Sequence, residues 1–247
     1  MKNSTECNNV DFFERMISIF RSVYEETRKH RGWLLWRKFD LFVVDVHNLI
    51  VDRYKDKMPP KSLTESLTYQ RILDLIKTAW LITFNVYSGA YRSAMRNLRF
   101  ILEALIQAYY LDKKFPYTFA TEKFEYADVN KLYGTRLMRK ARMPRNIRAL
   151  YQKLCKYVHS SKEELEHIDE ILMEKGTIDT TFVFDEDLFE KCRQLTMDSI
   201  DAISYVIIKA FPEIAEEFGK LVKERELEEA FRKSELKLCA NFLCKTE

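Results

Sequence analysis

Glycine and proline are scarce in this chain of 247 residues, which contains five of each. β-Sandwiches and barrels need many tight turns and use these two residues to make them, so their scarcity argues against an all-β fold. Hydrophobic residues make up 47% of the sequence and charged residues 32%, which provides both a core and a solvated surface. We therefore predict a soluble all-α protein built from long helices with short connections.

The sequence also lacks a long apolar run. Its most hydrophobic stretch, Leu98 to Leu111, is interrupted by two charged residues and a glutamine, whereas a membrane-spanning helix needs about 20 mostly apolar residues. The N-terminus lacks the apolar core of a signal peptide, because charged side chains follow from Asp11 on. We therefore expect a cytoplasmic protein with no membrane partner.

Spacings typical of metal sites are missing as well. The five cysteines are scattered and odd in number, and only Cys239 and Cys244 lie near each other. None of the four histidines has a second ligand at helical spacing, whereas a structural zinc site needs such pairs. In a cytoplasmic chain the cysteines are expected to be free thiols. We predict no metal site and no cofactor.

Helical periodicity runs along most of the chain and divides it into three parts. Residues 1–60 are expected to form a helical hairpin that packs on the core. Residues 61–211 are expected to form the main helical bundle, and residues 212–247 a charged C-terminal helix. The predicted fold class is all-α, a multi-helix bundle.

Helix boundaries inside the bundle follow from prolines and capping residues. A helix with a weaker pattern is expected from Lys123 to Arg142. After Pro144 a clearer amphipathic helix is expected, with His159 at its C-terminal end. Asp185 or Asp187 is expected to cap a further long helix.

The most hydrophobic helix, 92–112, carries a polar stripe. At 100° per residue, Arg92, Arg96, Arg99 and Glu103 fall within about 60° of one another, while apolar residues cover most of the remaining surface. Burying an unpaired charge costs on the order of several kcal/mol. The stripe therefore faces a partner subunit, a set of carboxylates, or a wet cleft in which its guanidinium groups bind phosphate. The structural alternative is an ordinary solvent-facing stripe with a weak pair between Arg99 and Glu103.

Positive charge is concentrated between Val129 and Lys162, where ten lysines and arginines occur without one acidic residue. The next segment, up to Glu190, holds eleven acidic residues against a single lysine. A block of one sign is typical of a surface that binds a polyanion. The residues that we predict to contact nucleic acid are Arg92, Arg139, Lys140, Arg142, Arg145, Arg148 and Lys156.

His159 lies near the C-terminal end of this basic block. A histidine exchanges protons near neutral pH and is the most frequent general acid or base in enzymes. It is also a common helix C-cap, where the helix dipole favours the protonated ring. The residue type therefore leaves a catalytic and a structural interpretation open.

Two stretches together resemble the HEPN superfamily, RSAMRNLRFILEAL at 92–105 and LYQKLCKYVHSS at 150–161. The resemblance covers about residues 62–210. It implies a helical bundle, often dimeric, in a family that includes toxins, abortive-infection proteins and CRISPR-associated ribonucleases. Active members carry an arginine a few residues before a histidine on one helix. In this chain Lys153 is the only basic residue four to seven positions before His159.

The resemblance implies that the protein cleaves RNA without a metal ion, in a defence or toxin-like setting. His159 would remove the proton of a ribose 2′-hydroxyl, while Arg96, Arg99 or Lys153 would stabilise the charge that develops on the phosphate. Glu103 would orient a guanidinium group. A homodimer with two copies of His159 in one cleft would supply the second proton donor.

A non-catalytic adaptor or scaffold subunit is the alternative from another class. In that interpretation the basic block binds nucleic acid or an acidic protein partner, such as the 163–190 segment of a second copy. Tyr133, Tyr151 and Tyr157 alternate with the positive charges and would provide stacking surfaces for bases. Binding to nucleic acid would weaken steeply with salt, because it releases counterions.

Overall fold

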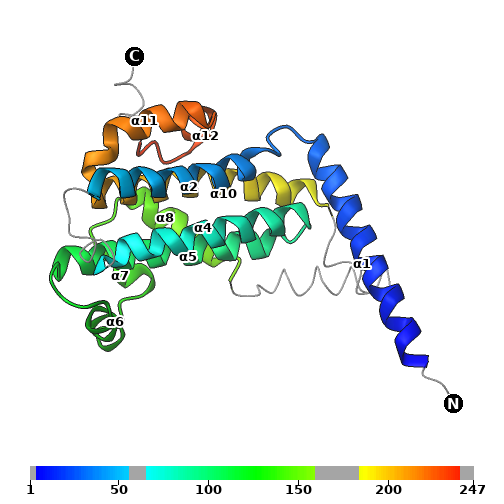
Figure 1. The fold of residues 1–247 in the computed structure, drawn as a ribbon, viewed down its shortest axis with the longest axis horizontal. Coiled ribbons are helices and arrows are strands. Elements are labelled where there is room, and N and C mark those ends of the chain that lie inside the picture. Colours follow the sequence, from blue (N-terminus) through cyan, green and yellow to red (C-terminus); the bar gives the residue numbers. More distant parts are fainter. Residues whose placement is uncertain (1–3, 56–64, 159–183, 240–247) are drawn as a thin grey trace.

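The computed structural model describes residues 4–55, 65–158 and 184–239, with side chains from residue 14 on. Within these ranges every regular element is helical, so the all-α, multi-helix fold class is confirmed (Figure 1). The elements are α1 (Ser4–Lys29), α2 (Leu35–Tyr54), α4 (Leu67–Tyr87), α5 (Tyr91–Lys114), α6 (Ala120–Val129), α7 (Gly134–Lys140), α8 (Arg145–Cys155), α10 (Glu186–Ala210), the 3-10 turn η2 (Pro212–Ile214), α11 (Ala215–Glu224) and α12 (Glu228–Lys233).

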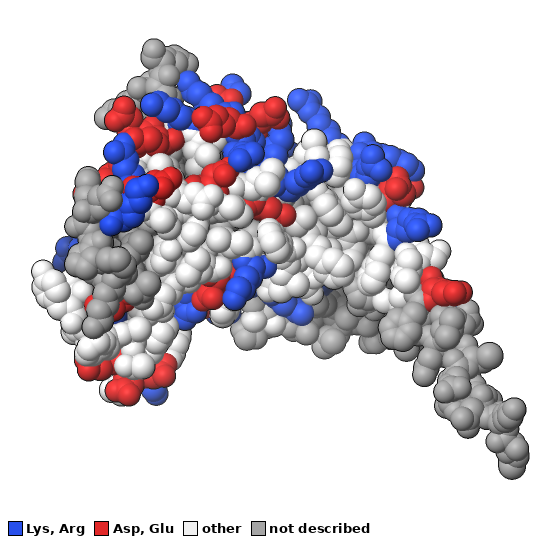
Figure 2. All heavy atoms as spheres, in the orientation of Figure 1, with Lys and Arg blue, Asp and Glu red and all other residues white. Residues whose placement is uncertain are grey.

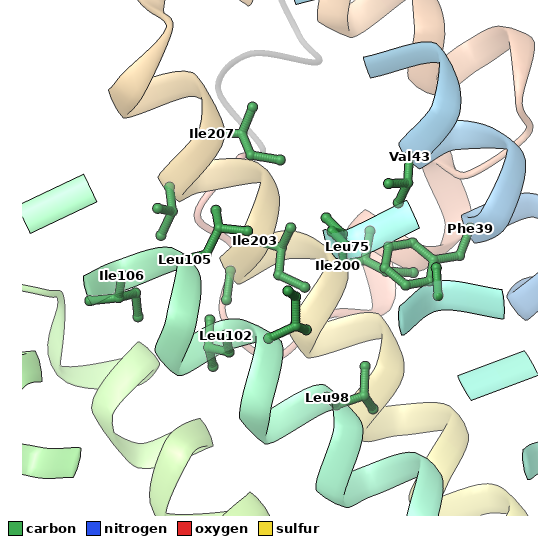
Figure 3. Close-up of a cluster of buried hydrophobic side chains, with 14 of the residues drawn as sticks. Phe39, Val43, Leu75, Leu98, Leu102, Leu105, Ile106, Ile200, Ile203 and Ile207 are labelled. Atoms are coloured by element: carbon green, nitrogen blue, oxygen red, sulfur yellow. The ribbon is translucent and has the colours of Figure 1, made fainter. Parts of the chain in front are cut away.

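The long helices α2, α4, α5 and α10 pack together at the centre of the molecule (Figure 1). α4 and α5 follow each other through a short turn in which Gly89 has φ +80°, a left-handed value that glycine adopts without strain. Figure 3 shows the apolar side chains that meet between these helices, and those labelled in it are Phe39, Val43, Leu75, Leu98, Leu102, Leu105, Ile106, Ile200, Ile203 and Ile207. The apolar composition of α5 therefore reflects its place in the core.

The first two helices differ in how they contribute to this core. α2 belongs to the central bundle, where Trp36 is fully buried and its indole N–H donates to Thr196 Oγ1 of α10 at 3.0 Å. α1 packs against α4, and its Phe20 ring lies 6.2 Å from the ring of Phe84, edge to face. Among the described helices, none is long and apolar enough to cross a membrane.

The helix predicted from Lys123 to Arg142 is two helices, α6 and α7, and the prediction of one continuous helix was wrong. The chain turns between them, where Lys131 adopts φ +47° and the side chain of Leu132 is fully buried. Gln107 of α5 donates to the carbonyl of Leu132 at 2.9 Å and holds the turn in place. This break fixes the direction of α7 relative to α8.

The prediction of one charged helix after Pro212 was also wrong for the described residues. It is replaced by η2, α11 and α12, with Glu226 at φ +52° between the last two helices. The break folds the segment back, so that Phe218 and Phe231 pack their rings against Phe42 of α2. Tertiary burial of these aromatic residues outweighs the helical propensity of the charged residues around them.

The N-cap of α10 was predicted as Asp185 or Asp187, and it is Asp185. Its carboxylate accepts a hydrogen bond from the amide of Leu188 at 2.9 Å. Such a cap satisfies one of the amides that have no partner at a helix N-terminus.

Candidate functional site

The polar stripe of α5 faces α8 at its C-terminal half. Arg99 Nη2 lies 2.9 Å from Glu103 Oε2 and donates to the hydroxyl of Tyr151 at 2.6 Å. The guanidinium carbon is 5.2 Å from the centroid of the Tyr151 ring, which places the cation over the aromatic face. Arg99 thus pairs with one carboxylate of its own helix and with a hydroxyl group of α8.

Glu103 connects this contact to α7. Its second carboxylate oxygen accepts the amide of Gly134 at 2.5 Å, at the first residue of α7. Gly134 has φ +58°, and a Cβ built there would lie 3.6 Å from the Tyr151 hydroxyl. Burial raises the pKa of Tyr151, so this hydroxyl remains a neutral hydrogen-bonding group. The network therefore ties α5, α7 and α8 into one rigid unit.

Arg96 lies next to the chain that leaves α8. Its Nε donates to the carbonyl of Tyr157 at 2.5 Å, and the residue is exposed to solvent. Burial raises the pKa of Tyr157, and the nearby charge of Arg92 lowers it by less. Arg92 is therefore also close to the chain that leaves α8. His159, two positions beyond Tyr157, lies outside the described residues.

Lys153 lies away from the arginines of α5. Its Nζ is 2.7 Å from Glu235 Oε2, in the segment that follows α12, and this hydrogen bond raises the pKa of the lysine. Tyr151, which contacts Arg99, is two residues earlier, and two residues on a helix point about 200° apart. The structure therefore does not bring Lys153 together with Arg96 and Arg99.

Three of the predicted arginines line one cavity of about 510 Å³ between α7 and α8. Arg139 comes from α7, and Arg145 and Arg148 come from the first turn of α8. Thr135 and Gln152, each about one turn from one of these arginines, add polar side chains to the wall. All the residues that line this cavity lie in the described ranges, and none of them is acidic. We call this cavity the arginine pocket.

The arginines of the arginine pocket have no side-chain partner among the described residues. In the part of the chain that the structure describes, no side-chain hydrogen bond or ion pair involves Arg139, Arg145 or Arg148. The Nε of Arg148 is buried and has no hydrogen-bond partner there. The first turn of α8 contains no acidic residue, so its backbone amides add positive potential. The pocket thus provides donors and positive charge, and none of the described residues in its wall supplies an anion.

Three of the other four residues predicted to bind nucleic acid, Lys140, Arg142 and Lys156, are exposed on or next to α7 and α8, whereas Arg92 lies on α5. Lys140 follows Arg139 at the end of α7, and Arg142 lies in the turn to α8 with φ +54°. Lys156 is one turn beyond Gln152, on the same face of α8, because four residues return the helix to nearly the same direction. Positive side chains therefore also lie in the turn between α7 and α8 and just beyond the pocket at the end of α8.

The tyrosines that alternate with the basic residues differ from the expectation. Tyr151 is 2% exposed and is held by Arg99, so its ring is closed to bases, and the stacking prediction was wrong for this residue. Tyr157 is half-buried against the core. Tyr133 is 48% exposed, and its hydroxyl donates to Asp128. The ring of Tyr133 alone among the three offers a large solvent-facing surface.

A second cavity, of about 470 Å³, lies beside the turn between α1 and α2 and is also lined by residues of α10 and α12. Its basic side chains are paired within the wall. Lys38 lies 2.6 Å from Glu226, and Arg193 lies 2.5 Å from Glu190. The arginine pocket differs from this cavity because its arginines have no such acidic neighbours.

Sequence reasoning missed Thr135 and Gln152 as parts of the site. A signal for them was present, since Thr135 and Arg139 are four residues apart, and Arg145, Arg148 and Gln152 have the spacing of one helical face. The prediction of a single helix over Lys123 to Arg142 obscured this signal. The direction of α7, and so of Thr135 and Arg139, depends on the turn before Gly134.

Comparison of the chain with protein-family models, with curated proteins and with solved structures gave no match. In the described ranges, no group of histidine, cysteine and acidic side chains is arranged to hold a metal ion. The functional argument therefore starts from the arginine pocket and the α5 arginines beside it.

Proposed function

We propose that the protein binds RNA and that the arginine pocket holds a phosphate of the RNA backbone. The observation that carries this proposal is the convergence of Arg139, Arg145 and Arg148 on one cavity with no carboxylate in its wall. Like charges held together repel one another, and a bound phosphate offsets that repulsion. Guanidinium groups match phosphate oxygens with paired hydrogen bonds, so phosphate is the anion that this wall fits best.

The surroundings of the pocket support a polyanion over a small anion. Lys140, Arg142 and Lys156 extend the positive surface along α7 and α8, so that a chain of phosphates has further contacts beyond the first. The resemblance to the HEPN superfamily, which rests on the α5 and α8 sequences, favours RNA among the polyanions. Exposed Tyr133, at the start of α7, offers a ring for a base to stack on.

The test measures binding of a fluorescently labelled single-stranded RNA by anisotropy. The variant Arg139→Ala/Arg145→Ala/Arg148→Ala is compared with Arg21→Ala/Lys191→Ala/Lys220→Ala, which removes the same charge from exposed positions on α1, α10 and α11. We expect the pocket variant to bind at least about tenfold more weakly and the control to bind like the wild type. Equal losses of RNA affinity in both variants would show that the pocket arginines contribute only to the overall positive charge, which contradicts the proposal. A wild type that does not bind RNA would also refute it.

A metal-independent ribonuclease is the second candidate, and the position of Arg96 favours it. The guanidinium group of Arg96 is hydrogen-bonded to the carbonyl of Tyr157, two residues before His159. Tyr157 precedes His159 by two residues, so the contact joins Arg96 to the chain segment that leads to the histidine. Arg99, held by Glu103 and Tyr151, lies one turn further along the same helix face.

In this second candidate the RNA supplies its own nucleophile. His159 accepts the proton of a ribose 2′-hydroxyl, and the 2′-oxygen attacks the adjacent phosphorus. The bond to the 5′-oxygen breaks, a second proton donor protonates that oxygen, and a 2′,3′-cyclic phosphate is left. Arg96 stabilises the additional charge on the phosphate in the transition state. The second copy of His159 in a homodimer is our proposed donor.

Incubation of end-labelled RNA with the protein in EDTA tests this candidate. We expect cleavage by the wild type, loss of cleavage in His159→Ala and in Arg96→Ala, and unchanged cleavage in Arg21→Ala, an exposed residue of α1. Intact RNA with the wild type, together with normal RNA binding, would leave the protein a non-catalytic RNA-binding adaptor.

A further inference from the structure

The outer face of α4 is apolar although it is largely exposed to solvent, with α1 packed only near its C-terminal end through the rings of Phe20 and Phe84. Its exposed residues are Leu73, Lys77, Trp80, Leu81 and Phe84, so four of the five are large hydrophobic residues. The opposite face of the same helix is fully buried in the core. A surface helix usually has a polar outer face, and α4 therefore departs from the ordinary amphipathic pattern.

The helices that pack on α4 also expose large apolar side chains. Phe100 of α5 is 54% exposed, and Leu41 of α2 is 45% exposed. In Figure 2 charged side chains gather over α11 and α12, while the surface over the middle of the long helices is largely uncharged. Aromatic side chains carry about 150–250 Å² each, so Trp80, Phe84 and Phe100, each more than half exposed, supply several hundred Å² with their neighbours. This apolar area is larger than that of single scattered surface residues, and it approaches the area that one partner contributes to a specific interface.

The positions on α4 have the spacing of a helix–helix seam. Leu73, Lys77, Trp80 and Phe84 follow one another at intervals of four, three and four residues, the alternation of a heptad pattern. The pattern is symmetric about a point between Lys77 and Trp80. In an antiparallel pair of α4 helices, a two-fold axis at that point sets Leu73 opposite Phe84 of the second copy.

The same axis sets Lys77 opposite Trp80 of the second copy. A lysine ammonium group over an indole ring is an attractive arrangement, so the one charge of the stripe gains a partner in both copies. Self-complementarity of this kind is what a two-fold interface requires, since each copy presents the same surface. We propose that the outer face of α4 is a homodimer interface, with two α4 helices packed antiparallel.

A second copy of this chain fits the stripe better than an RNA or an acidic protein does. Lys77 is the single basic residue among the exposed residues of α4, whereas polyanion binding needs several. The arginine pocket lies between α7 and α8, which pack on α5, so a dimer through α4 leaves both pockets open.

The experiment is the molar mass of the full chain, measured by light scattering during size-exclusion chromatography and by analytical ultracentrifugation. We expect the wild type at twice 29.6 kDa and Trp80→Glu at 29.6 kDa. Tyr117→Glu is the matched control, because Tyr117 is 99% exposed outside the stripe, and we expect it to remain dimeric. Circular dichroism identifies any variant that has lost its helices.

A milder pair keeps the proposal falsifiable if Trp80→Glu fails to fold. Lys77→Ala removes the ammonium group, and Lys77→Arg retains a cation above the ring. We expect Lys77→Ala to raise the dimer dissociation constant severalfold and Lys77→Arg to leave it near the wild-type value. A wild type that sediments as a monomer, a dimer that persists in folded Trp80→Glu, or wild-type monomers that bind phosphatidylcholine vesicles through Trp80 would overturn the proposal.

Discussion

Arg145 and Arg148 occupy positions that simple electrostatics disfavours. They lie in the first turn of α8, where the helix dipole is positive, and Arg139 of α7 faces the same cavity. Proteins commonly retain unfavourable charge where a ligand needs it, and a binding site is then less stable without its ligand. The arginine pocket has this character, because no carboxylate of its wall compensates the three cations.

Arg145→Ala is therefore expected to stabilise the ligand-free protein while it weakens RNA binding. Removing one cation from the N-terminal turn of a helix raises the free energy of unfolding by about 0.3–1 kcal/mol. Urea unfolding in low-salt buffer without phosphate measures the change. Added inorganic phosphate should raise the thermal midpoint of the wild type more than that of Arg145→Ala, because a ligand stabilises only the state that binds it. A variant less stable than the wild type would contradict this account of the pocket.

Asp40 makes the stability of the protein depend on pH. Burial raises the pKa of its carboxyl group from about 3.8 to about 6, although Thr83 donates a hydrogen bond to it at 2.9 Å and lowers the pKa. The folded state thus holds a proton that the unfolded state releases between pH 4 and 6, and stability falls as the pH rises through this window.

The variant Asp40→Asn removes this titration and keeps an oxygen for Thr83. We expect Asp40→Asn to be more stable than the wild type at pH 7 and equal to it near pH 4. Urea unfolding of both proteins across this range measures the difference at each pH. A difference that stays constant between pH 4 and pH 7 would show that Asp40 does not titrate as stated.

At the scale of elements, buried Asp201 holds the segment after α12 on α10. Its carboxylate accepts hydrogen bonds from Ser234 Oγ at 3.0 Å, from the amide of Leu238 at 3.0 Å and from the amide of Cys239 at 2.9 Å. The residue is 1% exposed, so water cannot replace these bonds. This clamp is the physical reason why the charged C-terminal region folds back on the bundle.

Asp201→Ala is expected to destabilise the protein by about 2–4 kcal/mol, because it leaves several buried donors without a partner. Asp52→Ala is the control, since Asp52 is an exposed partner of Lys55 in an i,i+3 pair that is worth a few tenths of a kcal/mol. Urea unfolding gives both values. A loss below about 1 kcal/mol in Asp201→Ala would mean that the clamp is not needed for stability.

The helices of the bundle could be predicted because their apolar residues repeat with helical spacing. α5 and α8 stand out in this way, and Asp185 marks the start of α10. The turn between α6 and α7 and the breaks after Pro212 could not be predicted, because they depend on contacts with distant residues. Gln107 holds Leu132, and Asp201 holds Cys239, and neither pairing leaves a local pattern in the sequence.

At the scale of the whole molecule, the site is formed where α5, α7 and α8 meet. Its basic residues could be predicted from the run of positive charge, but which of them converge depends on how the three helices are set against one another. Glu103 fixes that geometry by contacting Arg99 on its own helix and Gly134 on α7. Lys153, which belongs to the same run of positive charge as the pocket arginines, is directed to Glu235 instead.

The salt dependence of RNA binding tests the central claim most directly. Each phosphate contact to single-stranded RNA contributes about 0.7 to the slope of log affinity against log salt concentration. The account predicts a steep slope for the wild type, a slope smaller by about 2 for Arg139→Ala/Arg145→Ala/Arg148→Ala, and an unchanged slope for Arg21→Ala/Lys191→Ala/Lys220→Ala. Equal slopes for the wild type and the pocket variant would contradict it, because the three arginines would then make no contact with the RNA backbone.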